Sequence, residues 1–279
     1  MSTGRTIDTG TEQLIARVED GVATLTMNRP ERRNALSDPM FQGMALALRE
    51  AELAPDVRCV VLTGAGGAFC SGGDVKGMAA AGEGGGERAA LTLDERIHRQ
   101  RLSQRETAGR IWRMPKPVIA SLPGAAAGAG LSLALACDLR IAAESAILTT
   151  AFAKVGFSGD YGGSFFLTQL VGAARARELY LLSDRLDAKE AERLGLVNRV
   201  VADAALESET RALASRLANG ATVAYRYMKE NINRALTGAS LEECLDLEAT
   251  HHVHTGLTED HREAAKAFVE KRTPTFKGR

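Results

Sequence analysis

Residues 156–164, GFSGDYGGS, place one carboxylate, Asp160, in a loop of four glycines and two serines, with Tyr161 directly after it. Glycines let the backbone approach a ligand closely or turn through positive φ. A carboxylate in such a loop is either an Asx-turn residue that bonds its own backbone or a group that transfers protons. The residue types alone leave both interpretations open.

Two glycine-rich junctions could supply backbone N–H groups to a ligand. Residues 67–78 read GAFCSGGDVKGM, and residues 124–133 read GAAAGAGLSL and run into an apolar helical pattern. The first N–H groups of a helix have no partner within the helix and carry the positive end of its dipole. Two such groups aimed at one carbonyl oxygen form an oxyanion hole. The small residues are equally compatible with tight packing and no ligand.

Other motifs are absent or weak. Neither glycine-rich turn carries the spacing of a dinucleotide-binding fingerprint, and no phosphate-binding P-loop or G-x-S-x-G nucleophile elbow occurs. Three histidines lie close together at His251, His252 and His254. Neighbouring positions do not share a helix face, so at most two of these rings meet. We therefore expect a surface or interface helix here and no metal site.

Composition excludes several classes of function. Lysine plus arginine equals aspartate plus glutamate, 35 of each, so no charge excess favours nucleic acid or a membrane surface as a partner. The four cysteines show no C-x-x-C spacing, which is typical of buried thiols in a reducing compartment. The first residues contain no long apolar run, so we expect a cytoplasmic protein with a disordered tail over residues 1–12.

The remaining pattern predicts the elements that position these loops. Alternation predicts a hairpin over 14–18 and 22–27, with a turn at 19–21, and a helix follows with Asp38 as its N-cap. Buried strands are expected at 57–64 and 117–122, and one or two more within 139–149. Residues 77–90 are expected to form a mobile loop, followed by a charged helix over 91–113. Helices are expected over the last third, at 173–183, 187–194, 203–219, 221–236, 240–255 and 258–271.

The segments 26–37 (TMNRPERRNALS), 60–78, 116–146, 176–201 and 258–278 resemble the crotonase, or enoyl-CoA hydratase/isomerase, superfamily in sequence and in order. The resemblance implies an α/β fold, a spiral of ββα repeats with a C-terminal helical trimerisation region. It implies a core at 13–205 that holds an acyl-CoA site and a helical region at 206–279. A homotrimer or homohexamer is implied as well, with an acyl-CoA substrate and no cofactor beyond the coenzyme A of the substrate.

The resemblance also assigns residues. The oxyanion hole falls on the N–H groups of Gly73 and Ala129, and they would hold a thioester enolate. The residues implied for CoA or substrate contact are Arg32, Arg33, Ala35, Gly72, Asp74, Val75, Lys76, Phe152, Phe268 and Lys271. The last two would reach CoA from a C-terminal helix, often that of a neighbouring subunit. A solvated face is the alternative for each of the charged residues.

The chain departs from the hydratases at both catalytic glutamates. Ser132 and Phe152 stand at those positions, so hydration by two glutamates is not expected. Other branches of the superfamily carry a catalytic aspartate at the position of Asp160, within a similar D-x-G-G setting. We therefore expect Asp160 to move a proton between carbons of the thioester, with Phe152 keeping the site dry and raising the pKa of the aspartate.

Three functions remain open on the sequence. The favoured one is an isomerase that works through Asp160. The second is a hydratase that uses Asp160 and a water molecule, and the third is an acyl-CoA-binding protein without catalysis.

Overall fold

The computed structural model describes residues 4–74, 77 and 91–279. In this part of the chain a seven-stranded sheet has the order β1-β2-β3-β4-β5-β7-β10, and a small sheet has the order β6-β8-β9. The large sheet consists of β1 (Arg5–Ile7), β2 (Leu14–Glu19), β3 (Val22–Met27), β4 (Cys59–Gly64), β5 (Val118–Leu122), β7 (Leu139–Ala143) and β10 (Arg199–Val201). The small sheet consists of β6 (Ala126–Ala127), β8 (Ile147–Thr149) and β9 (Leu186–Asp187).

The predicted hairpin is confirmed. β2 and β3 pair antiparallel from Leu14↔Met27 to Glu19↔Val22, and the two-residue turn has φ of 50° at Asp20 and 79° at Gly21. From β3 onward the strands of the large sheet run parallel, from β4 through β5 and β7 to β10. Parallel strands need covered faces, which explains the continuous apolar runs of β4 and β5.

The N-terminal segment is a correction to the expected disordered tail. Within the described residues 4–12, β1 pairs antiparallel with β2, and Ile7 is almost completely buried. The Arg5 guanidinium bonds both Asp56 and Glu50. One buried side chain and one charged anchor hold this strand, and neither produces a periodic pattern in the sequence.

Helix α1 (Asp38–Leu53) packs on one face of the large sheet and α8 (Leu206–Ala218) packs on the other. The helices between them in the chain are α3 (Leu93–Glu106), α4 (Ala108–Arg113), α5 (Ala129–Ala136), α6 (Gly163–Leu182) and α7 (Ala188–Arg193). Strand positions alternate between two cores: Val60 and Leu62 join the core under α1, α4 and α5, whereas Cys59 and Val61 pack against α8. Helix α8 begins directly after the expected boundary at residue 205, yet it covers the sheet that lies before that boundary.

Two details of the helices differ from the expectations. Ser37, not Asp38, is the N-cap of α1, since its side chain accepts a hydrogen bond from the Met40 N–H. The helix expected over 91–113 is divided into α3 and α4 at Thr107, whose φ is −113° and ψ −92°. The expectation for the loop at 77–90 falls, apart from Gly77, outside the described residues.

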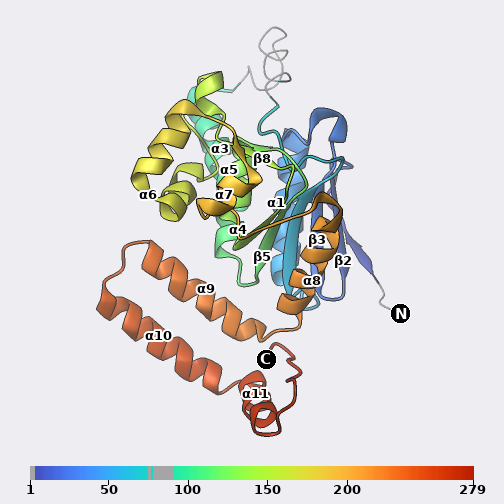
Figure 1. The fold of residues 1–279 in the computed structure, drawn as a ribbon, viewed down its shortest axis with the longest axis vertical. Helices are drawn as coiled ribbons and strands as arrows, with labels where there is room; N and C mark the ends of the chain where they lie inside the picture. Colours follow the sequence, from blue (N-terminus) through green and yellow to red (C-terminus); the bar gives the residue numbers. More distant parts are fainter. Residues whose placement is uncertain (1–3, 75–76, 78–90) are drawn as a thin grey trace.

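The last helices form an arm that lies apart from the sheet. These are α9 (Thr222–Leu236), α10 (Leu241–Gly256) and α11 (Glu259–Val269), drawn in orange to red in Figure 1. Lys229 of α9 ties the arm to the core, because its ammonium group bonds the Asp138 carboxylate at 2.7 Å and the Lys116 carbonyl at 3.0 Å. The predicted helices of the last third are confirmed with ends shifted by a few residues, except that α6 begins at Gly163, ahead of the expected start at 173.

Candidate functional site

The two glycine-rich junctions meet. Cys70 bridges Ala126 in a parallel pairing, and the Ala127 N–H donates to the Cys70 carbonyl at 2.9 Å. A Cβ on Gly72 would lie 2.9 Å from the Ala127 carbonyl oxygen and 3.7 Å from the Ala129 nitrogen, and the φ of Gly72 is +93°. Glycine is required here because both the backbone angle and the close approach exclude a side chain.

The N–H groups of Gly73 and Ala129 stay available at this junction. Among the described residues, neither N–H donates a hydrogen bond, although the flanking Leu36 and Asp74 amides are paired. Ala129 is the first residue of α5, and Gly128 precedes it with a φ of 53° and no capping side chain. Two unpaired N–H groups beside a helix N-terminus favour the binding of an oxygen that carries negative charge.

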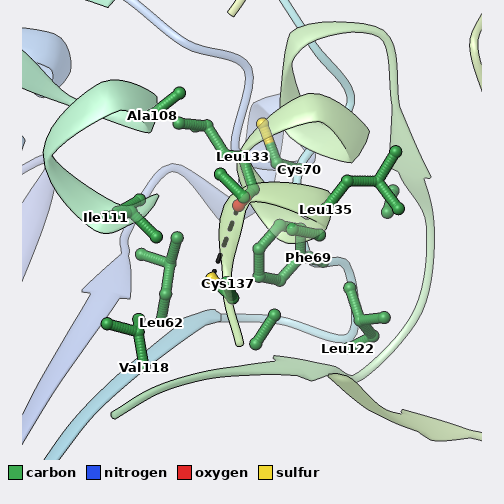
Figure 2. Close-up of a cluster of buried hydrophobic side chains, with 14 of the residues drawn as sticks. Leu62, Phe69, Cys70, Ala108, Ile111, Val118, Leu122, Leu133, Leu135 and Cys137 are labelled. Atoms are coloured by element: carbon green, nitrogen blue, oxygen red, sulfur yellow. Dashed lines mark hydrogen bonds between the residues drawn. The ribbon is translucent and has the colours of Figure 1, made fainter. Parts of the chain in front are cut away.

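The core fixes the position of α5. Every residue of this helix is buried, and Figure 2 shows Leu133 and Leu135 packed with Phe69 and Leu122 beneath it. The Cys137 thiol donates to the Leu133 carbonyl at 3.4 Å at the end of the helix. A helix held on all sides keeps its first N–H in place without reorganisation, which is what an oxyanion hole requires.

Asp160 lies in the loop directly before α6 and does not form an Asx turn. Its backbone carbonyl accepts the Gly163 N–H at 3.0 Å, but its carboxylate accepts no hydrogen bond from the described residues. The Oδ1 atom is buried and has no partner in the described part of the chain, and burial raises the pKa of this carboxyl from 3.8 to about 6. A carboxylate that is spare and partly desolvated is typical of a proton-transfer group.

Tyr161 holds this loop in place and does not orient the carboxylate. Its ring stacks on Phe41 with centroids 4.7 Å apart, and its hydroxyl lies 3.0 Å from the Ser103 hydroxyl. Its N–H donates to the Gln104 side-chain oxygen at 2.7 Å. Helix α3 therefore anchors the residue next to Asp160, and this explains why a loop of glycines keeps one conformation.

Phe152 and Ser132 occupy the surroundings of Gly128. Phe152 is buried, and its ring comes within 3.7 Å of the position that a Cβ on Gly128 would take. The Ser132 hydroxyl donates to the Gly128 carbonyl at 3.3 Å. Neither side chain is a base, because one is a phenyl ring and the other is a hydroxyl that already bonds the backbone. The structure thus brings Phe152 to the junction.

Tyr180 is a further site residue that the sequence analysis missed. Its ring stacks on Phe152 with centroids 5.8 Å apart, and its hydroxyl is buried with no partner among the residues that the structure describes. It belongs to the helical run ELYLL, where a tyrosine is indistinguishable from a packing residue. Only the fold places it beside Asp160.

The residues expected to contact CoA fall into two groups. Arg32 and Arg33 are exposed in the turn that leads to the Leu36↔Gly73 bridge. The buried Ala35 lies in the same turn, and its carbonyl accepts from Arg29. These residues therefore stand beside one of the two available N–H groups.

Asp74 is held by the protein itself. Its carboxylate pairs with Arg29 at 3.0 Å and accepts the Gly77 N–H at 2.9 Å, and both contacts hold its pKa below the usual value. Val75 and Lys76 lie outside the described residues. Arg29, which the sequence analysis did not single out, thus positions the segment that carries Gly73.

The structure does not bring Phe268 and Lys271 to Asp160 within one chain. Phe268 is 84% exposed on α11, at the far end of the arm from α3, α5 and α6 (Figure 1). Lys271 follows the helix with a φ of 56°. If Phe268 and Lys271 contact a site built around Asp160, that site must belong to another subunit.

The histidines of α10 lie within the arm. His251 is buried against α9, where its Nδ1 lies 2.6 Å from the Asn231 side-chain oxygen and its ring packs on Tyr227. His254 contacts the same tyrosine ring. No group of three or more His, Cys, Asp or Glu side chains in the described ranges could hold a metal ion.

Known proteins share this sequence and fold over nearly the whole chain. Residues 17–279 match the sequence profile of the family described as enoyl-CoA hydratase/isomerase. The chain belongs to the enoyl-CoA hydratase/isomerase family. The expected crotonase fold, with mixed α/β architecture and a C-terminal helical region, is confirmed.

Members of the family with different activities are similar to this chain. It is 38% identical to the 1,2-epoxyphenylacetyl-CoA isomerase of Escherichia coli, over 96% of this chain and 99% of that protein. The solved enoyl-CoA hydratase of Bacillus anthracis is 33% identical with a TM-score of 0.86, covering 96% and 100% of the two chains. An enoyl-CoA hydratase from a Polaromonas species is 36% identical with a TM-score of 0.84, covering 94% and 99%. The enzyme family is therefore shown, whereas isomerase and hydratase names both occur within it.

The described residues contain no helix that is long and apolar enough to cross a membrane.

Proposed function

We propose that this protein isomerises an acyl-CoA thioester by moving a proton with Asp160 while the N–H groups of Gly73 and Ala129 hold the enolate oxygen. The observation that carries the proposal is the spare Asp160 carboxylate, which bonds nothing in its own loop although Oδ1 is buried. A buried acceptor without a partner costs free energy, so a functional role explains why it is retained.

The chemistry follows from the two groups. Asp160 in its ionised form takes a proton from the α or γ carbon, and the electron pair moves into the thioester carbonyl to form an enolate. The Gly73 and Ala129 N–H groups stabilise the negative oxygen. Asp160 then returns the proton at another carbon, so the double bond changes position and no other reactant is consumed. The two N–H groups act on a charge that develops only during the reaction, so they lower the barrier.

The surroundings of Asp160 suit a base that must also act as an acid. With a pKa of about 6, the carboxyl is ionised in most molecules at neutral pH, yet its protonated form is accessible. Phe152 supplies the apolar wall, because its buried ring lies at the Gly128 junction. Desolvation thus provides the tuning, without a second carboxylate.

Hydration is the second candidate, because proteins of 33% and 36% identity are named enoyl-CoA hydratases. It would use Asp160 as the base for a water molecule. The serine and phenylalanine at positions 132 and 152 disfavour it, since water would be held by one carboxylate only. Binding of an acyl-CoA without catalysis is the third candidate.

One experiment separates the three candidates. The protein is incubated in deuterated water with Δ3-enoyl-CoA, Δ2-enoyl-CoA and a saturated acyl-CoA, and Asp160→Asn is the matched variant. Deuterium at Cα or Cγ that is lost in the variant supports the proposal, whereas a 3-hydroxyacyl product supports hydration. Tight binding without exchange or product in any substrate contradicts both enzymatic functions.

The remaining expectations belong to the same proposal. We propose that Arg32 and Arg33 meet CoA phosphates, that no cofactor beyond coenzyme A is needed, and that the enzyme acts in the cytoplasm. We also propose a homotrimer or a dimer of trimers. Exposed apolar side chains along the arm support the assembly, among them Met228, Ile232, Leu245, Val253 and Leu257.

A further inference from the structure

The Tyr180 hydroxyl is a buried polar group that the proposed reaction leaves unused. Its oxygen is closed to solvent and forms no hydrogen bond with the described residues. Buried tyrosine hydroxyls usually find a partner, because leaving one unpaired costs free energy. The ring itself is well packed by its stacking on Phe152.

This hydroxyl, which comes from α6, lies against the loop that carries Asp160. It is 3.2 Å from the position of a Cβ on Gly159 and 2.5 Å from that of a Cβ on Gly163. The two glycines flank Asp160, and a side chain at either position would collide with Tyr180. Two of the four glycines of GFSGDYGGS thus make room for this one ring.

Asp160 presents a second unpaired oxygen to the same region. Its Oδ1 is buried and has no partner within residues 4–74, 77 and 91–279, and it does not bond the Tyr180 hydroxyl. The groups are nevertheless close enough to interact: burial raises the pKa of Tyr180 to about 12, and the Asp160 charge adds to that shift. At neutral pH the tyrosine is therefore a donor, and the carboxylate is mostly an acceptor.

We propose that Asp160 and Tyr180 form a two-point site for one hydroxyl-bearing group, which accepts a hydrogen bond from Tyr180 and donates one to Asp160. The group is either a hydroxyl of the acyl chain or a water molecule, since the two present the same chemistry. This two-point site rests on the proposed function, because the oxygen of the bound group would lie beside Asp160, the carboxylate that moves protons.

The surrounding side chains make the site selective. Phe152 offers only apolar surface, and the Ser132 hydroxyl already donates to the Gly128 carbonyl. A hydrocarbon chain in this place would leave the Tyr180 hydroxyl and Asp160 Oδ1 unpaired. Sites built to bond a substrate hydroxyl reject analogues that lack it for this reason.

The test for an acyl hydroxyl uses binding alone. Dissociation constants are measured by calorimetry for butyryl-CoA, 3-hydroxybutyryl-CoA and 4-hydroxybutyryl-CoA with the wild type, Tyr180→Phe and Tyr227→Phe. We expect the wild type to prefer a hydroxylated ligand by roughly fivefold or more, and Tyr180→Phe to lose that preference. Tyr227→Phe is the matched control, because Tyr227 packs on His251 in the arm and should not affect the preference.

The test for water uses product analysis. Crotonyl-CoA is incubated in water labelled with oxygen-18, where addition of the labelled oxygen to C3 and of a proton to C2 gives 3-hydroxybutyryl-CoA. If water is the bound group, the wild type forms labelled product, and Tyr180→Phe slows its formation about tenfold or more while Tyr227→Phe does not.

Thermal unfolding separates these effects from misfolding. Tyr180→Phe removes an unpaired hydroxyl, so its Tm should equal or exceed that of the wild type, whereas Tyr161→Phe, which loses the contact with Ser103, should lower it. Either a hydroxyl preference or a labelled product that depends on Tyr180 supports the site. Equal binding of all three ligands together with no labelled product that depends on Tyr180 overturns it. The site can fail while the proposed function holds. That is the result if the wild type exchanges deuterium and Asp160→Asn does not.

Discussion

The hydroxyl of Tyr180 lies beside the backbone of Gly163, 2.5 Å from the place of an added Cβ, although both residues belong to α6. In a straight helix they would be separated by about 25 Å, at about 1.5 Å per residue. Gly172 divides the helix, with a φ of 74° and a ψ of 164°. The kink therefore returns the second half of α6 to the loop that carries Asp160.

Gly172→Ala tests this role of the kink. A Cβ there would meet nothing within 4 Å, so the substitution acts through the backbone alone. We expect the free energy of unfolding in urea to fall by about 1–3 kcal/mol, since non-glycine residues are strained in this conformation. Gly238→Ala is the matched control, because it also has positive φ and open space but lies in the arm. Both variants should lose stability, and only Gly172→Ala should reduce turnover.

The pH dependence of turnover should report on Asp160. The free enzyme needs the carboxylate ionised, and burial raises its pKa to about 6. We expect kcat/KM for deuterium exchange to be level above pH 7 and to fall about tenfold per pH unit well below pH 6. A profile that is flat from pH 4.5 to 8 would exclude Asp160 as the base.

Asp160→Asn should make the folded protein more stable at neutral pH. The pKa of Asp160 is higher in the folded protein, about 6, than the unfolded value of 3.8. The folded state therefore binds more protons between these values, and the free energy of unfolding decreases as pH rises through that window. Asparagine does not ionise, so the variant does not lose this free energy of unfolding as the pH rises. Its gain over the wild type should reach up to about 3 kcal/mol at pH 7.5 and vanish near pH 4.

Urea unfolding at several pH values measures this difference. Asp184→Asn, which replaces an exposed carboxylate, is the control and should stay within about 0.5 kcal/mol of the wild type at each pH. An Asp160→Asn variant less stable than the wild type at pH 7.5 would mean that the carboxylate has a structural partner.

Ala129→Pro removes one N–H of the oxyanion site and little else. Ala129 is the first residue of α5, where the fixed φ of proline is compatible with a helix. We expect kcat to fall about 10²–10³-fold with folding retained. Leu93→Pro makes the same change at the first position of α3 and should leave the rate and the circular dichroism spectrum close to those of the wild type. Unchanged turnover in Ala129→Pro would remove this amide from the mechanism.

The sequence predicted most elements of the fold because their signals are local. Alternation identified the β2–β3 hairpin, and continuous apolar runs identified β4 and β5. β1 was missed because its stability comes from pairing with β2 and from Arg5 bonding acids far along the chain. The break at Thr107 was missed as well, since it reflects packing and not a glycine or proline.

The part of the site that is formed by backbone N–H groups was predictable from the sequence. The residues at 72–73 and 128–129 are small because two chain segments touch there, and this leaves a signature in the sequence. Whether Asp160 bonds its own loop could not be decided, because Asx turns and catalytic loops have the same composition. Tyr180 could not be found, since its place depends on the kink at Gly172 and its sequence context is an ordinary apolar helix.

The last prediction concerns the two residues that the single chain keeps away from Asp160. Helix α11, which contains Phe268 and directly precedes Lys271, lies at the far end of the arm from α3, α5 and α6 (Figure 1), so a role in CoA binding requires a neighbouring subunit. Lys271→Glu should then raise KM for an acyl-CoA about tenfold or more with little change in kcat, because a CoA phosphate contact acts equally on bound substrate and transition state. Lys266→Glu, on α11 shortly before Lys271, is the control.

Mixed oligomers test the same prediction without relying on KM. Asp160→Asn chains and Lys271→Glu chains are each defective, and they are unfolded and refolded together. If Lys271 serves a neighbour's site, some mixed sites receive an intact Asp160 from one chain and an intact Lys271 from the other, and activity at low acyl-CoA concentration recovers. If every site is complete within one chain, the mixture shows only the sum of its components, and the intersubunit contact is wrong.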